Sequence, residues 1–138
     1  MISALLLVTC ANFSGTYVSR LDNGWTIKLD LRQSECDKLD AVYDYEGTRV
    51  ARKIPLDGVK RPILDNADVR SLESFRWLSG DTILSEVEVY WKENGRITFA
   101  ENRMSQDAQG NWIEAETYFD ADHRPTGENL TIYFKAAP

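Results

Sequence analysis

The side chains that could carry out chemistry are few and scattered along the chain. His123 is the single histidine, and it lies in a polar turn, 120–127, where neighbouring carboxylates could orient it as a general base. A turn of this composition is normally solvated, so we expect His123 to be an ordinary surface residue. No Ser or Cys stands in a nucleophile motif, and no glycine-rich phosphate loop is present in the sequence. We therefore expect a protein that is not an enzyme and that uses no cofactor.

Acidic residues form the densest group of ionisable side chains. Residues 81–120 hold nine acidic and three basic residues, so this stretch alone accounts for the net charge of −6. An acidic protein repels phosphate backbones and is not expected to bind nucleic acid. Calcium needs oxygen ligands that converge from loops, so we expect no metal site on strands. We expect instead an acidic face that could dock a basic protein partner, formed by Glu86, Glu88, Glu101, Glu114 and Glu116.

Strands must position these residues, because apolar and polar residues alternate along most of the chain. The clearest alternation runs from Trp25 to Leu31. A period of two, interrupted by turn residues at short intervals, is typical of antiparallel β structure. A long meander tends to close on itself, since closure removes its exposed edges. The sequence therefore predicts an all-β, antiparallel up-and-down meander that closes into a small barrel, with about ten strands at 13–19, 24–33, 38–45, 48–54, 59–64, 69–78, 82–92, 96–106, 111–120 and 129–136.

The turn at Asn94-Gly95 is the strongest two-residue hairpin signal in the chain, because both residue types tolerate positive φ. It predicts that Trp91 stands opposite Thr98 and that Val89 stands opposite Ala100. These pairs would share the core face of the sheet, whereas Tyr90 would pair with Phe99 on the opposite face.

The next hairpin turns at 107–110 and allows two registers. A three-residue loop would place Glu114 and Glu116 on the core face, whereas a four-residue loop would set Gln106 opposite Asn111 and turn both carboxylates outward. Burying unpaired carboxylates costs several kcal/mol each, roughly. We therefore expect the four-residue loop.

A third hairpin, with its turn at 45–48, sets Asp44 opposite Arg49 and turns Arg52 toward the interior. An inward charge could bind the anionic group of a ligand, or it could reach the mouth of the barrel. A small barrel can enclose one small ligand, although inward aromatic residues can equally fill a solid core. The residues expected to line such a cavity are Trp25, Tyr43, Arg52, Trp77, Trp91 and Phe134.

The N-terminal end is an apolar run that is too short to span a bilayer as a helix. It resembles the hydrophobic region of a signal peptide without its basic start. Leu7 to Cys10 resembles a bacterial lipobox, with Thr9 where Gly, Ala or Ser is usual, and so makes Cys10 a lipidation candidate. We therefore divide the chain into a truncated signal or lipobox-like segment, 1–11, and a single β-barrel domain, 12–138, which is long enough to bury one core.

Other interpretations of this end remain open. Ordinary signal cleavage could follow Ala11, or residues 3–9 could form a buried first strand of a cytosolic protein. The two cysteines, Cys10 and Cys36, also allow one disulfide, which would suit an oxidising compartment.

Residues Asn12 to Tyr17 resemble the first strand of lipocalin-type barrels, in which an aromatic residue precedes Gly-x-Trp and Tyr17 here stands in place of the Trp. The resemblance implies a small up-and-down barrel with an apolar pocket at one end, and many bacterial proteins of this kind are outer-membrane lipoproteins. We therefore expect a bacterial envelope protein, at the outer membrane or in the periplasm, that binds a small apolar or amphipathic ligand. It would touch the membrane only through a lipid on Cys10. The alternative is an interaction module with a filled core and an acidic docking face on strands 82–120.

Overall fold

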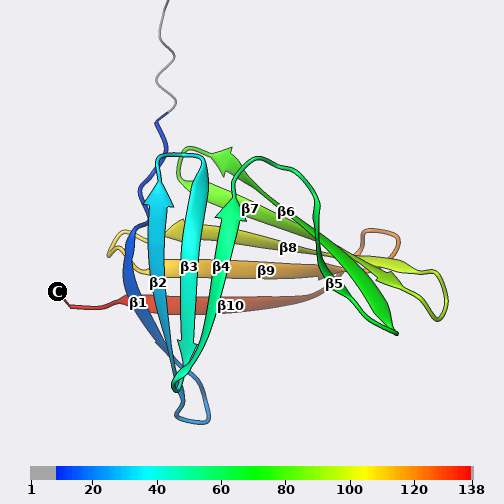
Figure 1. Ribbon diagram of the computed structural model, residues 1–138, viewed down its shortest axis with the longest axis horizontal. Helices are drawn as coiled ribbons and strands as arrows, with labels where there is room; N and C mark the ends of the chain where they lie inside the picture. The colour runs from blue at the N-terminus through cyan, green and yellow to red at the C-terminus, as the bar shows by residue number, and fades with distance from the viewer. Residues whose placement is uncertain (1–8, 138) are drawn as a thin grey trace, which may run out of the picture.

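The computed structural model describes residues 9–137 and shows ten antiparallel strands (Figure 1). The predicted all-β meander is confirmed, with strand ends that differ by a few residues from those expected. Most of the apolar N-terminal run lies outside the described residues. Within them, no helix is long and apolar enough to cross a membrane. The strands are β1 (Gly15–Arg20), β2 (Thr26–Ser34), β3 (Lys38–Tyr45), β4 (Thr48–Pro55), β5 (Arg61–Asp65), β6 (Val69–Ser79), β7 (Thr82–Trp91), β8 (Ile97–Gln106), β9 (Trp112–Phe119) and β10 (Pro125–Lys135).

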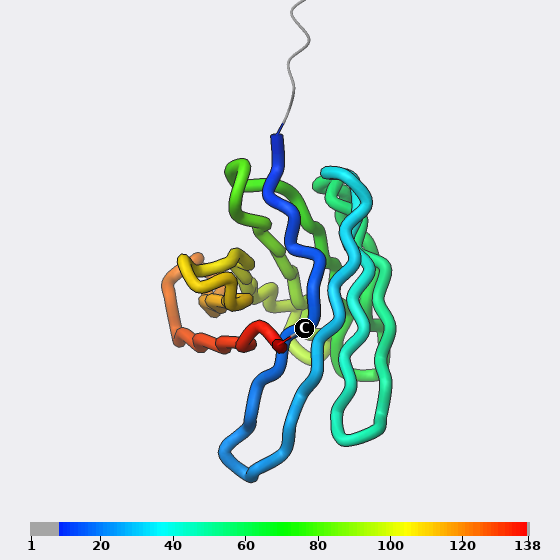
Figure 2. The backbone as a smooth tube through the Cα atoms, turned by 90° about the vertical axis from the view of Figure 1, so that its left-hand side faces the viewer, coloured from blue at the N-terminus to red at the C-terminus, as the bar shows by residue number. Residues whose placement is uncertain are grey.

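The strands form one sheet in the order β4-β3-β2-β1-β10-β9-β8-β7-β6-β5. The sheet curls so that β2, β3 and β4 cross in front of β7 to β10 (Figure 1), and the view from the side shows two layers (Figure 2). The first and last strands meet through a short pairing, Tyr17 with Lys135 and Val18 with Phe134. The two edge strands, β4 and β5, do not pair with each other, so hydrogen bonds do not close the sheet.

The core lies between the two layers and is built from the inward positions of both. Phe13 and Trp112 are 1% exposed and meet edge to face, with ring centroids 5.0 Å apart. The hydroxyl of Tyr17 donates to the carbonyl oxygen of Phe13 at 2.8 Å and accepts from Gln106 Nε2 at 2.7 Å, so its polar end is satisfied although the residue is fully buried. The segment before β1 is thereby fixed to the core.

The register predicted for the β3–β4 hairpin is confirmed, with Asp44 opposite Arg49 and Arg52 opposite Ala41. Glu46 and Gly47 both have positive φ, 49° and 93°, as a two-residue hairpin turn of this type requires.

The register predicted for the β7–β8 hairpin is wrong by two residues. Val89, not Trp91, stands opposite Thr98, because the loop has four residues instead of two. Trp91 N donates to Arg96 O and Gly95 N donates to Trp91 O, both at 2.8 Å, which closes the longer loop. A shift of two residues preserves the faces, so Val89 and Thr98 still share one side of the sheet.

The register expected for the β8–β9 hairpin is also wrong, and this error matters more. Gly110 adopts φ 82° and closes a three-residue loop, in which Asp107 N donates to Asn111 O at 3.0 Å. Glu114 therefore stands opposite Met104 and faces inward. A shift of one residue moves every side chain of β9 to the other face.

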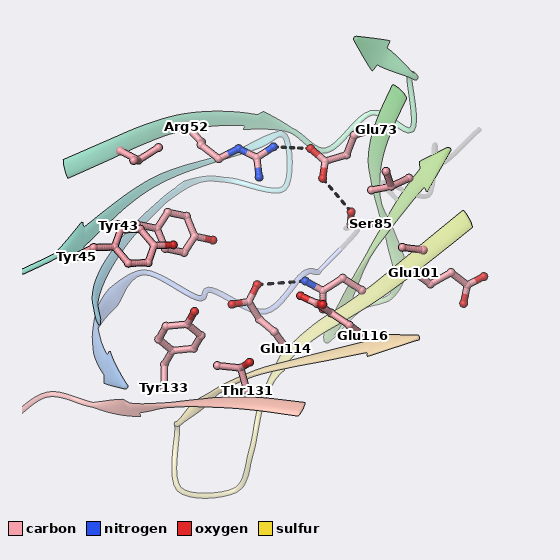
Figure 3. A pocket seen from close by; sticks show the side chains of 14 residues that line it. Tyr43, Tyr45, Arg52, Glu73, Ser85, Glu101, Glu114, Glu116, Thr131 and Tyr133 are labelled. Carbon is pink, nitrogen blue, oxygen red and sulfur yellow. Dashed lines mark hydrogen bonds and ion pairs between the residues drawn. The ribbon is translucent and has the colours of Figure 1, made fainter. Parts of the chain in front are cut away.

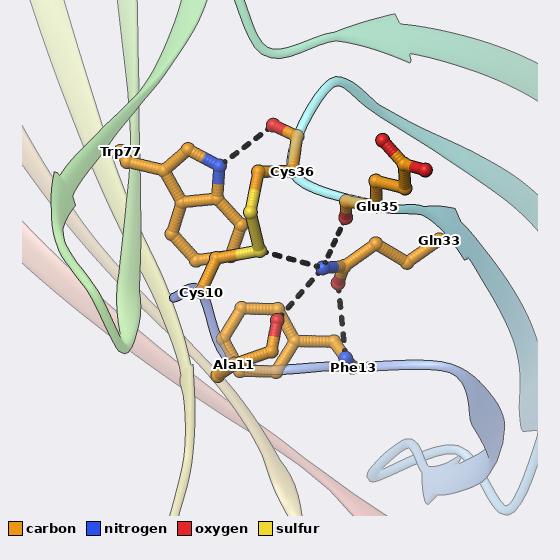
Figure 4. The surroundings of a disulfide bond; sticks show 7 residues. All are labelled: Cys10, Ala11, Phe13, Gln33, Glu35, Cys36 and Trp77. Atoms are coloured by element: carbon orange, nitrogen blue, oxygen red, sulfur yellow. Dashed lines mark hydrogen bonds between the residues drawn. A yellow bond between two sulfur atoms is a disulfide. The ribbon is translucent and has the colours of Figure 1, made fainter. Parts of the chain in front are cut away.

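A disulfide between Cys10 and Cys36 ties the N-terminal segment to the β2–β3 turn (Figure 4). Gln33 Nε2 lies beside it and donates to the carbonyl oxygens of Ala11 and Glu35, each at 2.7 Å. A sulfur atom in this bond cannot also carry a lipid thioether, so the disulfide and the lipidation predicted for Cys10 exclude each other.

Candidate functional site

A cavity of about 400 Å³ opens between the two layers, beside the core. It lies at the C-terminal end of β3, whereas the disulfide lies next to the N-terminal end of the same strand. Side chains from β3, β4 and β6 to β10 converge on it (Figure 3). The lining residues are Tyr43, Tyr45, Val50, Arg52, Glu73, Ser85, Val87, Ala100, Glu101, Asn102, Glu114, Glu116, Thr131 and Tyr133.

The cavity exists because the inward positions change character along the strands. On β9 the inward residues run from Trp112, which fills the core, to Glu114 and Glu116. On β3 they run from Leu39 to Tyr43. Period-two alternation keeps all of these side chains inside, but polar groups replace the closely packed apolar ones at this end of the strands, and space remains between them.

Arg52 and Glu73 form an ion pair at one wall of the cavity, joining edge strand β4 to β6. Ser85 Oγ donates to Glu73 Oε2 at 3.4 Å, and the Arg52 guanidinium lies 5.6 Å from the centroid of the Phe75 ring. The Arg52 charge is therefore already neutralised within the protein.

Glu114 projects into the cavity from β9 with 9% of its surface exposed. Asn102 Nδ2 donates to Glu114 Oε1 at 3.2 Å. Burial raises the pKa of Glu114, the hydrogen bond from Asn102 opposes this rise, and the nearby charge of Glu116 adds to it. Among residues 9–137, neither Glu114 nor Glu116 forms an ion pair with a basic side chain.

Two tyrosines flank this carboxyl group. Burial, followed by the charge of Glu114, raises the pKa of both Tyr43 and Tyr133, so both remain neutral phenols. Asn102 Oδ1 is buried and has no hydrogen-bond partner in the described part of the chain. The carboxylates of Glu114 and Glu116 therefore share the cavity with neutral tyrosine hydroxyls and have no basic partner in the described chain.

The structure brings together only part of the cavity residues expected from the sequence. Tyr43 and Arg52 line the cavity. Trp77 is half-buried against the core, and its Nε1 donates to Cys36 O at 2.9 Å. The inward placement expected for the others is wrong, since their exposed fractions are high: Trp25 55%, Trp91 43% and Phe134 59%.

Each misplaced aromatic residue has a local reason. Trp25 precedes β2 in a turn, where Leu21 N donates to its carbonyl oxygen at 2.7 Å. Trp91 ends β7, and the longer β7–β8 loop carries it beyond the core. Phe134 follows Tyr133, which is the inward residue at this point of β10, so Phe134 faces outward.

The prediction that the five glutamates form a single acidic face is also wrong. Glu114 and Glu116 lie on the inner side of the sheet, whereas Glu101 points away from them (Figure 3). The outer glutamates pair with basic side chains, which gives the ion pairs Arg76–Glu86, Lys60–Glu88 and Arg103–Glu101.

His123 is exposed, as expected, and stacks on Phe99 with ring centroids 4.0 Å apart. Both residues border a smaller hollow of about 150 Å³. No group of three or more His, Cys, Asp or Glu residues within 9–137 is arranged to hold a metal ion.

Several residues that line the cavity were not expected there from the sequence. Glu73 and Trp77 are separated by an even number of positions on β6, so alternation places both side chains on the same face. Because Trp77 was expected to point inward, Glu73 could have been expected inside as well. Glu114 could have been placed inside by the glycine that ends its hairpin loop, a known signal for a three-residue turn with a bulge. No local signal indicates Tyr133 or Asn102 as neighbours of Glu114.

Comparison of the sequence with protein-family models finds no match, and comparison with curated proteins finds none either. The cavity is therefore the main indication of function.

Proposed function

We propose that the protein is a non-enzymatic binding protein that holds one small amphipathic molecule in its cavity. The observation that carries this proposal is the cavity itself: about 400 Å³ lined by convergent polar groups and tyrosine rings. Such volumes and such mixed linings are typical of small-molecule sites. The polar share of the lining favours an amphipathic ligand over a purely apolar one. An interaction module with a filled core fits less well, because space remains beside the core and the outer carboxylates are divided among ion pairs.

We also infer that the curled sheet acts as a small, lipocalin-like barrel, although hydrogen bonds leave it open between β4 and β5. The Arg52–Glu73 ion pair bridges this opening on the inner side. Backbone contacts of the connecting segment support the same edge, since Leu56 N donates to Asp37 O and Gly58 N to Phe75 O, both at 2.8 Å.

An envelope location, in the periplasm or at the outer membrane of a bacterium, remains our proposal for the site of action. The Cys10–Cys36 disulfide supports it, because such bonds persist in oxidising compartments. Intact-mass analysis of the mature protein from its source cells tests this point. A mass with one disulfide and without the apolar segment that precedes Cys10 is expected, and a reduced, full-length chain would contradict export.

The binding function can be tested with n-hexanol as a neutral amphipathic probe and a cavity-filling variant. Backbone amide chemical shifts should change saturably at millimolar hexanol, and the changes should be concentrated on strands that line the cavity. Ala100→Trp should abolish them, because Ala100 lines the cavity. Ala51→Trp is the matched control, since Ala51 is exposed on the edge strand β4. Shift changes that survive in Ala100→Trp would place the binding elsewhere.

A further inference from the structure

We propose that the cavity recognises a small organic cation, an alkylammonium whose charged nitrogen sits against Glu114 and Glu116 and whose carbon chain lies along the tyrosine rings. This inference rests on the proposed binding function and names the chemical class of its ligand. It differs from the expectation that Arg52 anchors an anionic group.

The balance of charge in the cavity favours a cation. Its one basic residue, Arg52, is paired with Glu73 and lies over Phe75. Glu114 and Glu116 have no such partner within the described chain. An anion would have to displace Glu73 from Arg52 and then lie near two further carboxylates, whereas a cation meets only unneutralised negative charge.

The hydrogen-bonding groups favour the same class. Among the hydrogen bonds of the described chain, Glu116 accepts from the Tyr118 hydroxyl and Glu114 from the Asn102 amide, and neither carboxylate accepts from a cationic donor. A primary ammonium carries three donors and no acceptor, so it can donate to Glu114 and Glu116 together. A carboxylate ligand would bring a further negative charge and no donor for Glu114 and Glu116.

Aromatic rings lie where the rest of such a ligand would go. Tyr43 and Tyr45 stack with their centroids 6.2 Å apart and line the cavity together with Tyr133. Ring faces attract cations and also accept aliphatic chains. Figure 3 shows these rings and Glu114 around one shared space.

The protonation of Glu114 adds a measurable signature. Burial raises its pKa in the free protein, and a neighbouring ammonium would lower it again, so binding should release a proton from the fraction of Glu114 that is protonated. The titratable and charged groups that line the cavity around Glu114 are Tyr43, Tyr45, Arg52, Glu73, Glu101, Glu116 and Tyr133.

Calorimetric titration with three probes of equal chain length tests the inference: n-hexylamine, n-hexanol and hexanoate. At neutral pH the amine should bind at least about tenfold more tightly than the alcohol, the scale expected for one charge-assisted contact. Hexanoate should bind most weakly. Repeating the amine titration at stepwise lower pH, in buffers of different ionisation enthalpy, should show net proton release that grows as Glu114 becomes protonated in the free protein.

Glu114→Gln removes the charge and preserves the shape, and it should reduce amine affinity about tenfold while leaving hexanol affinity within about twofold. Glu86→Gln, on the outer face, is the matched control and should change neither. If Glu114→Gln does not fold, Glu116→Gln replaces it, with the same probes and the same expected loss of preference for the amine.

The outcomes separate the two proposals. Equal binding of amine and alcohol, tighter binding of hexanoate, or an amine preference that survives in Glu114→Gln overturns the cation inference but leaves the binding function standing. Absence of binding for all three probes overturns both. Amine binding that persists in Ala100→Trp places the cation outside the cavity and overturns the inference as well.

Discussion

Glu114 is the residue whose surroundings depart most from those that its type prefers. It lies inside the sheet, 9% exposed, with an amide donor and tyrosines but no basic partner in the described chain. A protein tolerates a buried carboxyl group at a cost in stability, and such groups are concentrated at functional sites. This cost should be visible in how stability depends on pH.

Glu114→Gln should stabilise the protein increasingly as pH rises. In the wild-type chain the pKa of Glu114 is raised by folding, so above the ordinary carboxyl pKa the unfolded state ionises first and the free energy of unfolding falls until the folded-state pKa is passed. Glutamine does not ionise, so the variant does not lose free energy of unfolding in this way. Its free energy of unfolding should exceed that of the wild type by about 1.4 kcal/mol for each unit by which folding raises the pKa of Glu114. Urea denaturation between pH 4 and pH 8 measures the difference. Stability curves that run parallel at all pH values would show that Glu114 is not desolvated.

At the scale of elements, the turns decide which face of a strand points inward. Gly110 closes the β8–β9 loop with φ 82°, a conformation that residues with a side chain rarely adopt. The three-residue loop shifts β9 by one position relative to the expected register, and this shift places Glu114 and Glu116 inside. The cavity chemistry thus depends on one turn.

Gly110→Ala should lower the free energy of unfolding by about 1–2 kcal/mol, because alanine is strained at this φ. If the register changed instead, the cross-strand contacts between Met104 and Glu114 would be lost, and nuclear Overhauser effects between these residues would show the loss. Gly127→Ala is the control, since a Cβ there would meet Tyr118 Cδ2 at an ordinary 3.8 Å and no positive φ is required. A Gly110→Ala variant as stable as Gly127→Ala would contradict the assigned loop.

The hairpin registers also show how far turn signals can be trusted. The β3–β4 register was predictable, because Glu46-Gly47 marks a two-residue turn and opposite charges face each other across it. The β7–β8 register was not predictable in this way, although Asn94-Gly95 is a stronger two-residue turn signal than Glu46-Gly47. Lys92, in that loop, donates from its backbone N to Asp68 O at 2.9 Å and from Nζ to Asp65 at 2.6 Å. These contacts come from a distant turn, which a local reading cannot include.

For the whole molecule, the open question is how the curled sheet stays closed without hydrogen bonds between β4 and β5. The Arg52–Glu73 pair is the direct side-chain link across this opening on the cavity side. Its arginine side chain is 38% exposed, so solvent weakens the attraction, and the link should act on local opening more than on global stability.

Arg52→Met should therefore speed amide hydrogen exchange in β4 and β5 while exchange in β2 and β8 stays unchanged. Arg49→Met is the matched control on the same strand, because Arg49 pairs across the ladder with Asp44 and does not line the cavity. Hydrogen exchange with mass spectrometry resolves these segments. Identical exchange in both variants would show that the ion pair does not hold the opening.

The sequence by itself determined the strands, the meander, the β3–β4 register and the inward direction of Tyr43 and Arg52. These features depend on neighbours along the chain or across one hairpin, and period-two alternation and turn residues report on such neighbours directly. Only the tertiary structure decided that space remains beside the core and that Glu73, Asn102 and Tyr133 share it with Glu114. Their proximity comes from the curl of the sheet, which brings distant strands to one interior and which no local pattern encodes.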